Sequence, residues 1–190
     1  MKKALVVVDV QNDFCPGGAL PVPCGDEVIS VINKIVNEFN VVVLTRDWHP
    51  NGHCSFKEQG GLWPVHCVGG SNGALLRVNI NEYTDEIFDK GTRKDYDSYS
   101  GFGNEYENTG LEDYLKEKEV DEVYICGLAT DYCVKATALD AQKKGFKTYV
   151  IIDACRGVEV HNGDVVKAID EMKNVGIKII CSIDVIEGER

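Results

Sequence analysis

The sequence lacks any apolar run long enough to cross a membrane as a helix. Its first residues, MKKALVVVDV, place two lysines before an apolar stretch, but ALVVV is only five residues long where Asp9 ends it. The apolar core of a secretory signal peptide needs more residues than that. We therefore expect a cytoplasmic protein.

Basic residues are scarce relative to acidic ones. Twenty Lys and Arg residues against 31 Asp and Glu residues give a formal net charge of −11. A protein of this charge repels the phosphates of nucleic acids and anionic membrane surfaces, so neither is expected as a partner. A neutral or cationic small molecule is a better match for this composition.

The eight cysteines include no Cys-x-x-Cys pair. Without such a pair and without an export signal, the sequence does not suggest a disulfide framework. Most of the thiols should therefore be reduced and should pack as small apolar side chains.

Six short apolar runs alternate with segments of helical periodicity. Their Val and Ile residues are continuous, which indicates strands covered on both faces. The runs span residues 4–10, 41–47, 86–90, 122–128, 148–154 and 177–182. This alternation predicts a parallel, doubly wound α/β sheet. Because 190 residues of 44% hydrophobic content suit one core, we expect a single domain over residues 1–190.

Cap and turn residues locate the helices between these strands. Thr109 begins a Thr-x-x-Glu capping box and should open a helix, whereas Gly145 and Gly176 should end two others. Residues 48–85 and 91–107 interrupt the rhythm as long connections. Loops of that length in a compact domain are more often functional than idle.

Chemically versatile side chains stand where four of the predicted strands end. In an open parallel sheet, ligands bind beyond the carboxyl ends of the strands. The residues at this edge are Asp9, Asp47, Lys90 and Cys133. Each one alone fits a turn, a solvated surface or a core position, but their coincidence at one edge of the sheet favours an active site.

Cys133 differs from the other cysteines because it falls in the first turn of a predicted helix. The helix dipole and unpaired backbone N–H groups there favour the thiolate, which makes Cys133 the best nucleophile candidate. The alternative is a buried structural thiol like Cys126. For the base, Asp9 oriented by Lys90 is a better candidate than His161, which we expect to cap a helix.

Three of the four histidines fall within one short segment. The stretch DWHPNGH covers residues 47–53, and a further histidine follows in WPVHC. Asp-x-His-x₃-His with a distant third histidine is an oxygen and nitrogen donor set that suits Zn, Fe or Mn. The spacing alone fits equally well a polar loop packed beneath Trp48 and Trp63.

Longer motifs match a known family. The matching segments are DVQNDFCPGGALPV (9–22), TRDWHPNGHCSF (45–56), WPVHCV (63–68), DKG (89–91), YSGF (99–102) and GLATDYCVKATALDA (127–141). Over nearly its full length the chain resembles the nicotinamidase and pyrazinamidase group of the isochorismatase-like cysteine hydrolases. The resemblance implies a six-stranded parallel sheet of order 3-2-1-4-5-6 with helices on both faces.

The resemblance also implies an activity. Members of this group hydrolyse nicotinamide to nicotinate and ammonia through a cysteine thioester, in NAD salvage, and many also accept pyrazinamide. The implied triad has Asp9 as proton acceptor, Lys90 as its cationic partner and Cys133 as nucleophile. A cis peptide bond between Leu128 and Ala129 and an oxyanion hole formed by the N–H groups of Ala129 and Cys133 are implied as well.

A metal site and a ring-binding wall complete what the resemblance implies. The implied ligands of one divalent transition metal, Zn first and Fe or Mn otherwise, are Asp47, His49, His53 and His66. The ion accepts the pyridine nitrogen of the substrate. The implied aromatic wall consists of Phe14, Trp63 and Tyr99. A homo-oligomer is compatible with the family, and the small-molecule substrate is the only other partner we expect.

Three alternatives stay open at this point. A metal-independent amidohydrolase of the same fold, acting on a carbamoyl or ureido group, would use the same triad, but the three clustered histidines argue against it. A signalling receiver module shares the doubly wound sheet but needs several carboxylates and no thiol at the sheet edge. A redox sensor would use Cys133 as a thiol of low pKa.

Overall fold

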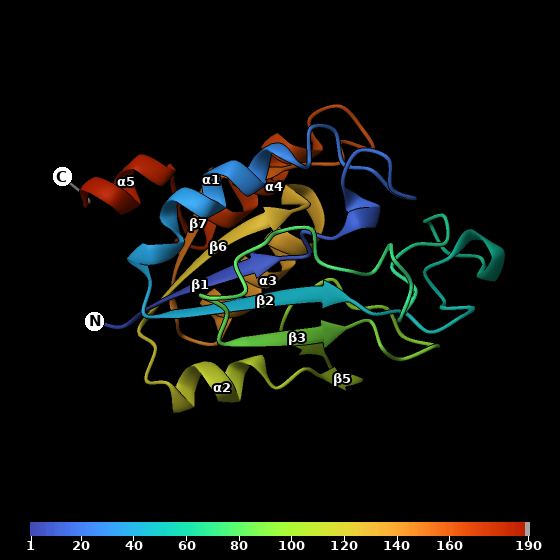
Figure 1. The fold of residues 1–190 in the computed structure, drawn as a ribbon, viewed down its shortest axis with the longest axis horizontal. Coiled ribbons are helices and arrows are strands. Elements are labelled where there is room, and N and C mark those ends of the chain that lie inside the picture. The colour runs from blue at the N-terminus through green and yellow to red at the C-terminus, as the bar shows by residue number, and fades with distance from the viewer. Residues whose placement is uncertain (189–190) are drawn as a thin grey trace.

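A single parallel sheet forms the centre of the protein. In the computed structural model, which describes residues 1–188, six strands pair in the order β3-β2-β1-β6-β7-β8. All five pairings are parallel (Figure 1). The strands are β1 (Lys3–Val8), β2 (Val41–Asp47), β3 (Glu86–Lys90), β6 (Glu122–Leu128), β7 (Lys147–Arg156) and β8 (Lys178–Ile180). This is the predicted order 3-2-1-4-5-6, so the fold prediction is confirmed.

The continuous apolar runs of the sequence form strands that are buried on both faces of the sheet. Every residue of β1 from Ala4 to Val8 is fully buried, and Val6 pairs with Val43 on one side and Ile125 on the other. Each of the six predicted runs overlaps one strand of the sheet. A separate antiparallel pair, β4 (Gly103–Asn104) and β5 (Glu107–Asn108), lies within the second long connection.

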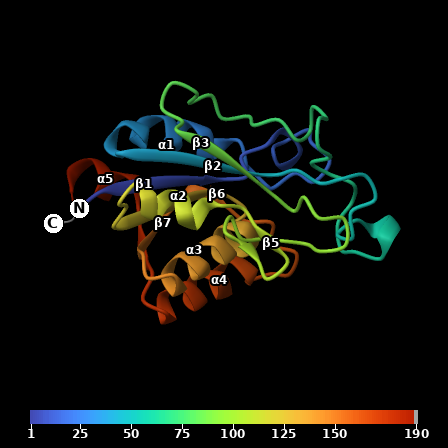
Figure 2. The ribbon, with the colours of Figure 1, turned by 90° about the horizontal axis from the view of Figure 1, so that it is seen from below.

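Helices cover the two faces of the sheet. The α-helices are α1 (Glu27–Ile35), α2 (Leu111–Glu117), α3 (Lys135–Lys143), α4 (Asp164–Asn174) and α5 (Ser182–Glu187). Helices α1 and α5 pack together on one face, and α3 packs with α4 on the other (Figure 2). Helix α2 lies beside the edge strand β3, where the rings of Phe88 and Tyr114 are 5.4 Å apart. Within the described residues, no helix combines the length and apolarity that a membrane span requires.

Shorter helical turns occur in the connections. The 3-10 turns are Asn12–Phe14, Val36–Glu38 and Lys57–Gln59, and a π-helical turn covers Thr130–Val134. This π-helical turn leads directly into α3.

Two of the predicted helix boundaries are correct and two are wrong. Gly145 and Gly176 lie just beyond the ends of α3 and α4, both with φ of +90°. The capping box at Thr109 does not form, because Gly110 occupies the N-cap of α2; the Thr109 hydroxyl accepts the Leu111 N–H at 3.3 Å and donates to the Gly101 carbonyl at 2.7 Å. His161 does not cap α4 either, since the chain turns at Gly163, which is the N-cap.

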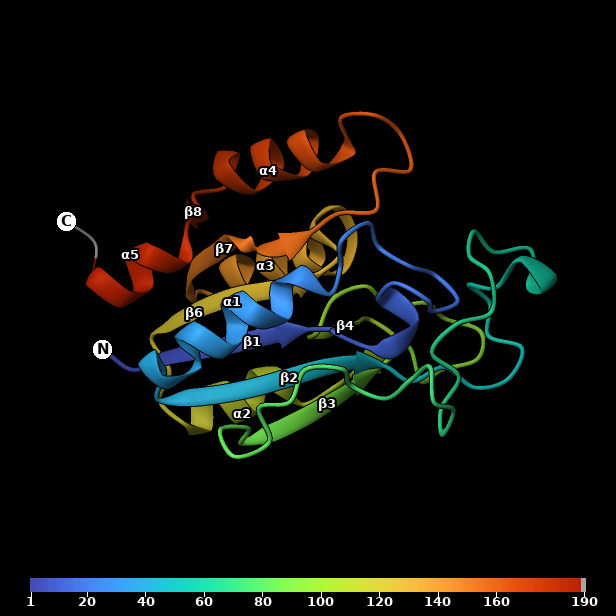
Figure 3. The same ribbon diagram turned by 45° about the horizontal axis from the view of Figure 1, so that its top comes forward.

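The long connections gather at one end of the sheet. The carboxyl ends of β1, β2 and β3 point the same way, and residues 48–85 and 91–107 extend from that end (Figures 1 and 3). The parallel sheet therefore brings strand ends that are far apart in sequence to one edge.

Gly127 is the position in the sheet where a side chain is excluded most directly. Its φ is +112°, and a Cβ atom there would lie 2.1 Å from the Val8 carbonyl oxygen on the neighbouring strand. We expect Gly127→Ala to lower the free energy of unfolding by roughly 3 kcal/mol or more, because backbone strain adds to the clash.

Gly145→Ala is the matched control. Gly145 also has a positive φ, but no heavy atom lies within 4 Å of its Cβ position, so the loss should be only about 1 kcal/mol. Urea unfolding followed by circular dichroism measures both variants. Equal losses would contradict the role of the close β1 contact.

Candidate active site

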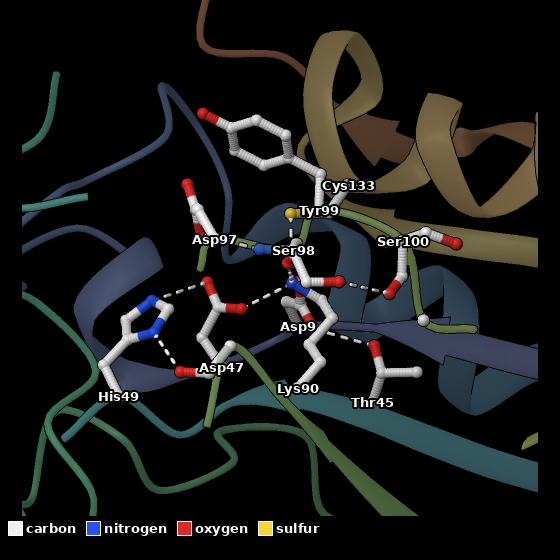
Figure 4. Close-up of polar contacts among 12 residues, drawn as sticks. Asp9, Thr45, Asp47, His49, Lys90, Asp97, Ser98, Tyr99, Ser100 and Cys133 are labelled. Carbon is white, nitrogen blue, oxygen red and sulfur yellow. Dashed lines mark hydrogen bonds and ion pairs between the residues drawn. The ribbon is translucent and has the colours of Figure 1, made fainter. Parts of the chain in front are cut away.

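The four residues predicted at the sheet edge meet in one buried cluster (Figure 4). Asp9 follows β1, Asp47 ends β2, Lys90 ends β3, and Cys133 lies in the turn after β6. Asp9 and Lys90 are fully buried, and Asp47 and Cys133 are nearly so. The parallel topology thus assembles two carboxylates, an ammonium group and a thiol from four separate strand ends.

The ammonium group of Lys90 is the centre of this cluster. Its Nζ donates hydrogen bonds to Asp47 Oδ1, to the Ser98 carbonyl at 3.2 Å and to Cys133 Sγ at 3.4 Å. It also lies 3.0 Å from Asp9 Oδ2. Burial alone lowers the pKa of Lys90, but Asp47 and Asp9 more than offset this and hold it well above its ordinary value. Lys90 is therefore a permanent cation in the site.

The Asp9 carboxylate keeps one oxygen available. Oδ1 accepts a hydrogen bond from Thr45 Oγ1 at 2.7 Å. Oδ2 is buried and receives no aligned hydrogen bond from any described residue, although the Lys90 ammonium is near it. One oxygen of each carboxylate and the Cys133 sulfur lie within 4.8 Å of one another. Asp9 is thus placed to exchange a proton with the thiol.

The burial of Cys133 opposes the stabilised thiolate that the sequence predicts. Burial raises the pKa of Cys133 well above its ordinary value; Lys90 opposes this shift, whereas Asp9 and Asp47 add to it. In addition, Cys133 lies in the π-helical turn and not in the first turn of an α-helix. Deprotonation of Cys133 therefore requires a proton acceptor, and burial raises the pKa of Asp9 toward that role.

The turn that precedes Cys133 has the predicted backbone. The peptide bond between Leu128 and Ala129 is cis. Ala129 and Cys133 both line the cavity described below. The assignment of their N–H groups to an oxyanion hole stays a prediction.

Asp47, His49 and His66 form a candidate metal site. The Nε2 atoms of the two histidines lie 3.5 and 4.0 Å from Asp47 Oδ2. Each Nδ1 bonds instead to a backbone carbonyl, that of Gly91 for His49 and that of Pro64 for His66, both at 2.8 Å. These outer bonds orient both rings so that Nε2 faces the carboxylate, as is usual for metal-ligating histidines.

The donor set fits a divalent transition metal. One carboxylate oxygen and two imidazole nitrogens suit zinc, and iron or manganese also accept such ligands. Burial lowers the pKa of His66, which favours the neutral imidazole that ligation needs, whereas Asp47 overcomes the effect of burial at His49 and raises its pKa. The Asp47 carboxylate is ionised, because Lys90 and His49 overcome the effect of burial and hold its pKa below the ordinary value.

His53, the fourth predicted ligand, lies next to this group, and its ligation of the ion stays a prediction. Its ring stacks on His49 with centroids 4.1 Å apart, and Nδ1 is 2.7 Å from Ser55 Oγ. Its Nε2 lies 3.3 Å from the Tyr96 carbonyl. His53 therefore lies next to the group of Asp47, His49 and His66. Together with His49 and Asp97 it forms a second group of possible ligands, which overlaps the first at His49.

A small cavity connects the thiol with the candidate metal site. The predicted aromatic residues Phe14, Trp63 and Tyr99 all line it, together with Cys133, Asp47, His49 and His66. The indole N–H of Trp63 donates to the Tyr99 hydroxyl at 3.1 Å, which fixes the two rings relative to each other. The cavity thus has apolar walls, a thiol at one place and metal-ligating groups at another.

Other residues of the site were not identified from the sequence. Tyr132 lines the cavity and packs edge-on against Trp63 at 4.9 Å; its position next to Cys133 was an available signal. Gln11 holds the Asp47 backbone, with 2.8 Å bonds to both its N–H and its carbonyl. Glu107 accepts the N–H groups of Gly91 and Thr92 at 2.8 Å, directly after Lys90. No periodicity or spacing marks Gln11 or Glu107.

Comparisons with known proteins agree with this arrangement. The family model described as the Isochorismatase domain matches residues 3–184. The nicotinamidase of Acinetobacter baylyi is 42% identical over 202 residues, covering 96% of this chain and 94% of that protein. The nicotinamidase/pyrazinamidase of Mycobacterium tuberculosis is 38% identical over 188 residues, covering 95% of this chain and 99% of that protein.

The same similarity extends to solved structures. The crystal structure of the pyrazinamidase of Pyrococcus horikoshii in complex with zinc superposes with a TM-score of 0.88 at 48% sequence identity. The superposition covers 95% of this chain and 99% of that chain. With the sheet order, the strand-end cluster and a domain match over most of its length, the chain belongs to the isochorismatase family.

Proposed function

We propose that this protein is a nicotinamidase that hydrolyses nicotinamide to nicotinate and ammonia, in NAD salvage, and that it also accepts pyrazinamide. The observation that carries the proposal is one small cavity that joins the Asp9, Lys90 and Cys133 cluster to an Asp-His-His group. A pyridine carboxamide has a reactive amide at one side of its ring and a ligating nitrogen at the other, which matches these two ends. The similarity to the nicotinamidases described above supports the same substrate.

The side chains define a reaction sequence that conserves atoms and charge. The Cys133 sulfur attacks the amide carbon while its proton moves to Asp9 Oδ2, the carboxylate oxygen that receives no aligned hydrogen bond. Asp9 then gives a proton to the departing amine, ammonia leaves, and a thioester remains. Asp9 next takes a proton from water, whose hydroxyl adds to the thioester carbon. The carbon–sulfur bond then breaks to release the acid, and Asp9 returns its proton to the sulfur, which regenerates the thiol. Lys90 keeps its charge throughout and offsets the negative charge that develops.

Backbone and ring contacts would hold the substrate during these steps. We assign the N–H groups of Ala129 and Cys133 to the amide oxygen, a contribution of about 3 kcal/mol per donor in acyl transfer. Phe14, Trp63 and Tyr99 would enclose the ring. A divalent ion held by Asp47, His49 and His66, with His53 beside them, would accept the pyridine nitrogen and anchor the ring.

The alternative is a metal-independent amidohydrolase of the same fold that acts on a carbamoyl or ureido group. It would use the same thiol and carboxylate but has no use for Asp47, His49 and His66 facing one cavity. The redox-sensor alternative is disfavoured because a buried thiol of raised pKa reacts slowly with oxidants.

The remaining proposals concern the protein as a whole. We propose one hydrolase domain over residues 1–190, whose partners are its small-molecule substrate and further copies of itself in a homo-oligomer. We also propose the cytoplasm as its compartment, because all eight cysteines are unpaired, which fits a reducing environment.

Purified protein should release ammonia from nicotinamide, and Cys133→Ala should abolish the release while the protein stays folded. The reason is that no other thiol lies within reach of both Lys90 and Asp9 among the described residues. A coupled ammonia assay measures the rate, and circular dichroism checks the fold. Cys126→Ala, which removes a buried thiol of the neighbouring strand, is the control. Undiminished turnover by Cys133→Ala would exclude the mechanism.

Lys90→Met should destabilise the protein by roughly 3–5 kcal/mol, because two buried carboxylates lose their cation. The matched control is Lys116→Met, which breaks an exposed ion pair with Glu112 at 2.5 Å and should cost less than about 1 kcal/mol. Urea unfolding at neutral pH measures both. Similar small losses would mean that the buried ion pairs do not stabilise the fold.

Removing the ion should affect two amides differently. Nicotinamide has a ring nitrogen for the ion to hold, whereas benzamide has the same ring shape and carboxamide without it. We expect a chelator to impair nicotinamide hydrolysis sharply and the slower benzamide hydrolysis much less. Steady-state rates before and after chelation, with metal analysis and a folding check, test this. Equal losses in a folded protein would instead assign the ion to the chemical step.

A further inference from the structure

A third carboxylate lines the cavity without an assigned role in the reaction. Asp97 is half-buried and belongs to the cavity wall together with Tyr99 and Tyr132. One of its carboxylate oxygens lies within 4.8 Å of a ring nitrogen of both His49 and His53. Figure 4 places Asp97 beside His49 and Tyr99, at the margin of the ion-pair cluster.

The position of Asp97 is fixed by its surroundings. Its Oδ1 accepts the Ser98 N–H at 2.9 Å, and its carbonyl accepts Asn104 Nδ2 at 2.7 Å. The next carbonyl along the chain, that of Ser98, accepts a hydrogen bond from Lys90 at 3.2 Å. These contacts place the Asp97 backbone and carboxylate near the reacting groups.

Asp97 also differs from the other two carboxylates in its partners. Asp9 and Asp47 both face the Lys90 ammonium, whereas Asp97 forms no ion pair with any lysine or arginine in residues 1–188. Its negative charge consequently remains uncompensated at the cavity wall.

The reaction changes the charge of the ligand in this cavity. The amide substrate is neutral, and the acid product is an anion at neutral pH. Lys90 and a divalent ion bound at Asp47 would together carry three positive charges, whereas Asp9 and Asp47 carry two negative charges. The site would then have one surplus positive charge. Without a further negative charge, the groups that stabilise the reaction would also hold the anionic product.

We propose that Asp97 is a specificity-determining residue that weakens binding of the anionic product relative to the neutral amide. The proposal rests on the proposed function, because it takes the product to be a pyridine carboxylate. The Asp97 charge cancels the surplus positive charge of the cavity and so favours product release, while a neutral amide is little affected. Asp97 thereby discriminates between two molecules of nearly the same shape by charge alone.

Calorimetric titration of metal-loaded Cys133→Ala protein measures both affinities without turnover. Adding Asp97→Asn, which keeps the shape and removes the charge, should strengthen nicotinate binding about tenfold, as expected for one charge at short range in a partly solvated site. Nicotinamide binding should change less than about twofold, since that ligand carries no net charge. With Cys133 intact, Asp97→Asn should show correspondingly stronger product inhibition.

Asp95→Asn is the matched control, because Asp95 is an exposed residue of the same connection and does not line this cavity. It removes one negative charge from the protein, as Asp97→Asn does, and should leave the ratio of the two affinities as it is. Equal changes for nicotinate and nicotinamide, an equal effect of Asp95→Asn, or loss of metal from Asp97→Asn would each overturn the proposal. Hydrolysis of nicotinamide by the unmodified protein, measured separately, shows whether a failure concerns Asp97 alone or the proposed function as well.

Discussion

The buried ammonium group of Lys90 is the interaction on which the site depends. An isolated charge in a protein interior is costly, and Lys90 is stable there only because Asp9 and Asp47 face it. The same ammonium contacts the thiol of Cys133. Lys90 thus links the candidate metal ligand Asp47 with the nucleophile Cys133. Asp9 and Asp47 both stabilise the buried ammonium group, in addition to any part they have in the reaction or in metal binding.

Much of this arrangement could be predicted from the sequence because it follows from sheet topology. Continuous apolar runs identify strands buried on both faces, and parallel connections bring all their carboxyl ends to one edge. Asp9, Asp47, Lys90 and Cys133 could therefore be placed together without a structure. Their motifs then indicated the family, and the sheet order implied by the resemblance is the observed one.

Other features depend on three-dimensional surroundings that spacing does not encode. The pKa of Cys133 is raised by its burial and by two carboxylates from other strands, neither of which local sequence reveals. His53 has the spacing of a ligand, but its ring stacks on His49 and its Nδ1 is close to Ser55 Oγ. The Gln11 side chain bonds to the backbone of Asp47. Such a contact to a backbone leaves no recognisable pair of side chains in the sequence, so it could not be predicted.

Strand β3 is an edge strand that pairs only with β2, yet its last residue is Lys90. Edge strands open more readily than central ones, and local opening costs less free energy than global unfolding. Glu107 restrains the end of β3 through the two amide groups that follow Lys90. The central cation of the site therefore lies at the margin of the sheet, and its position depends on the Glu107 contacts as well as on the pairing with β2.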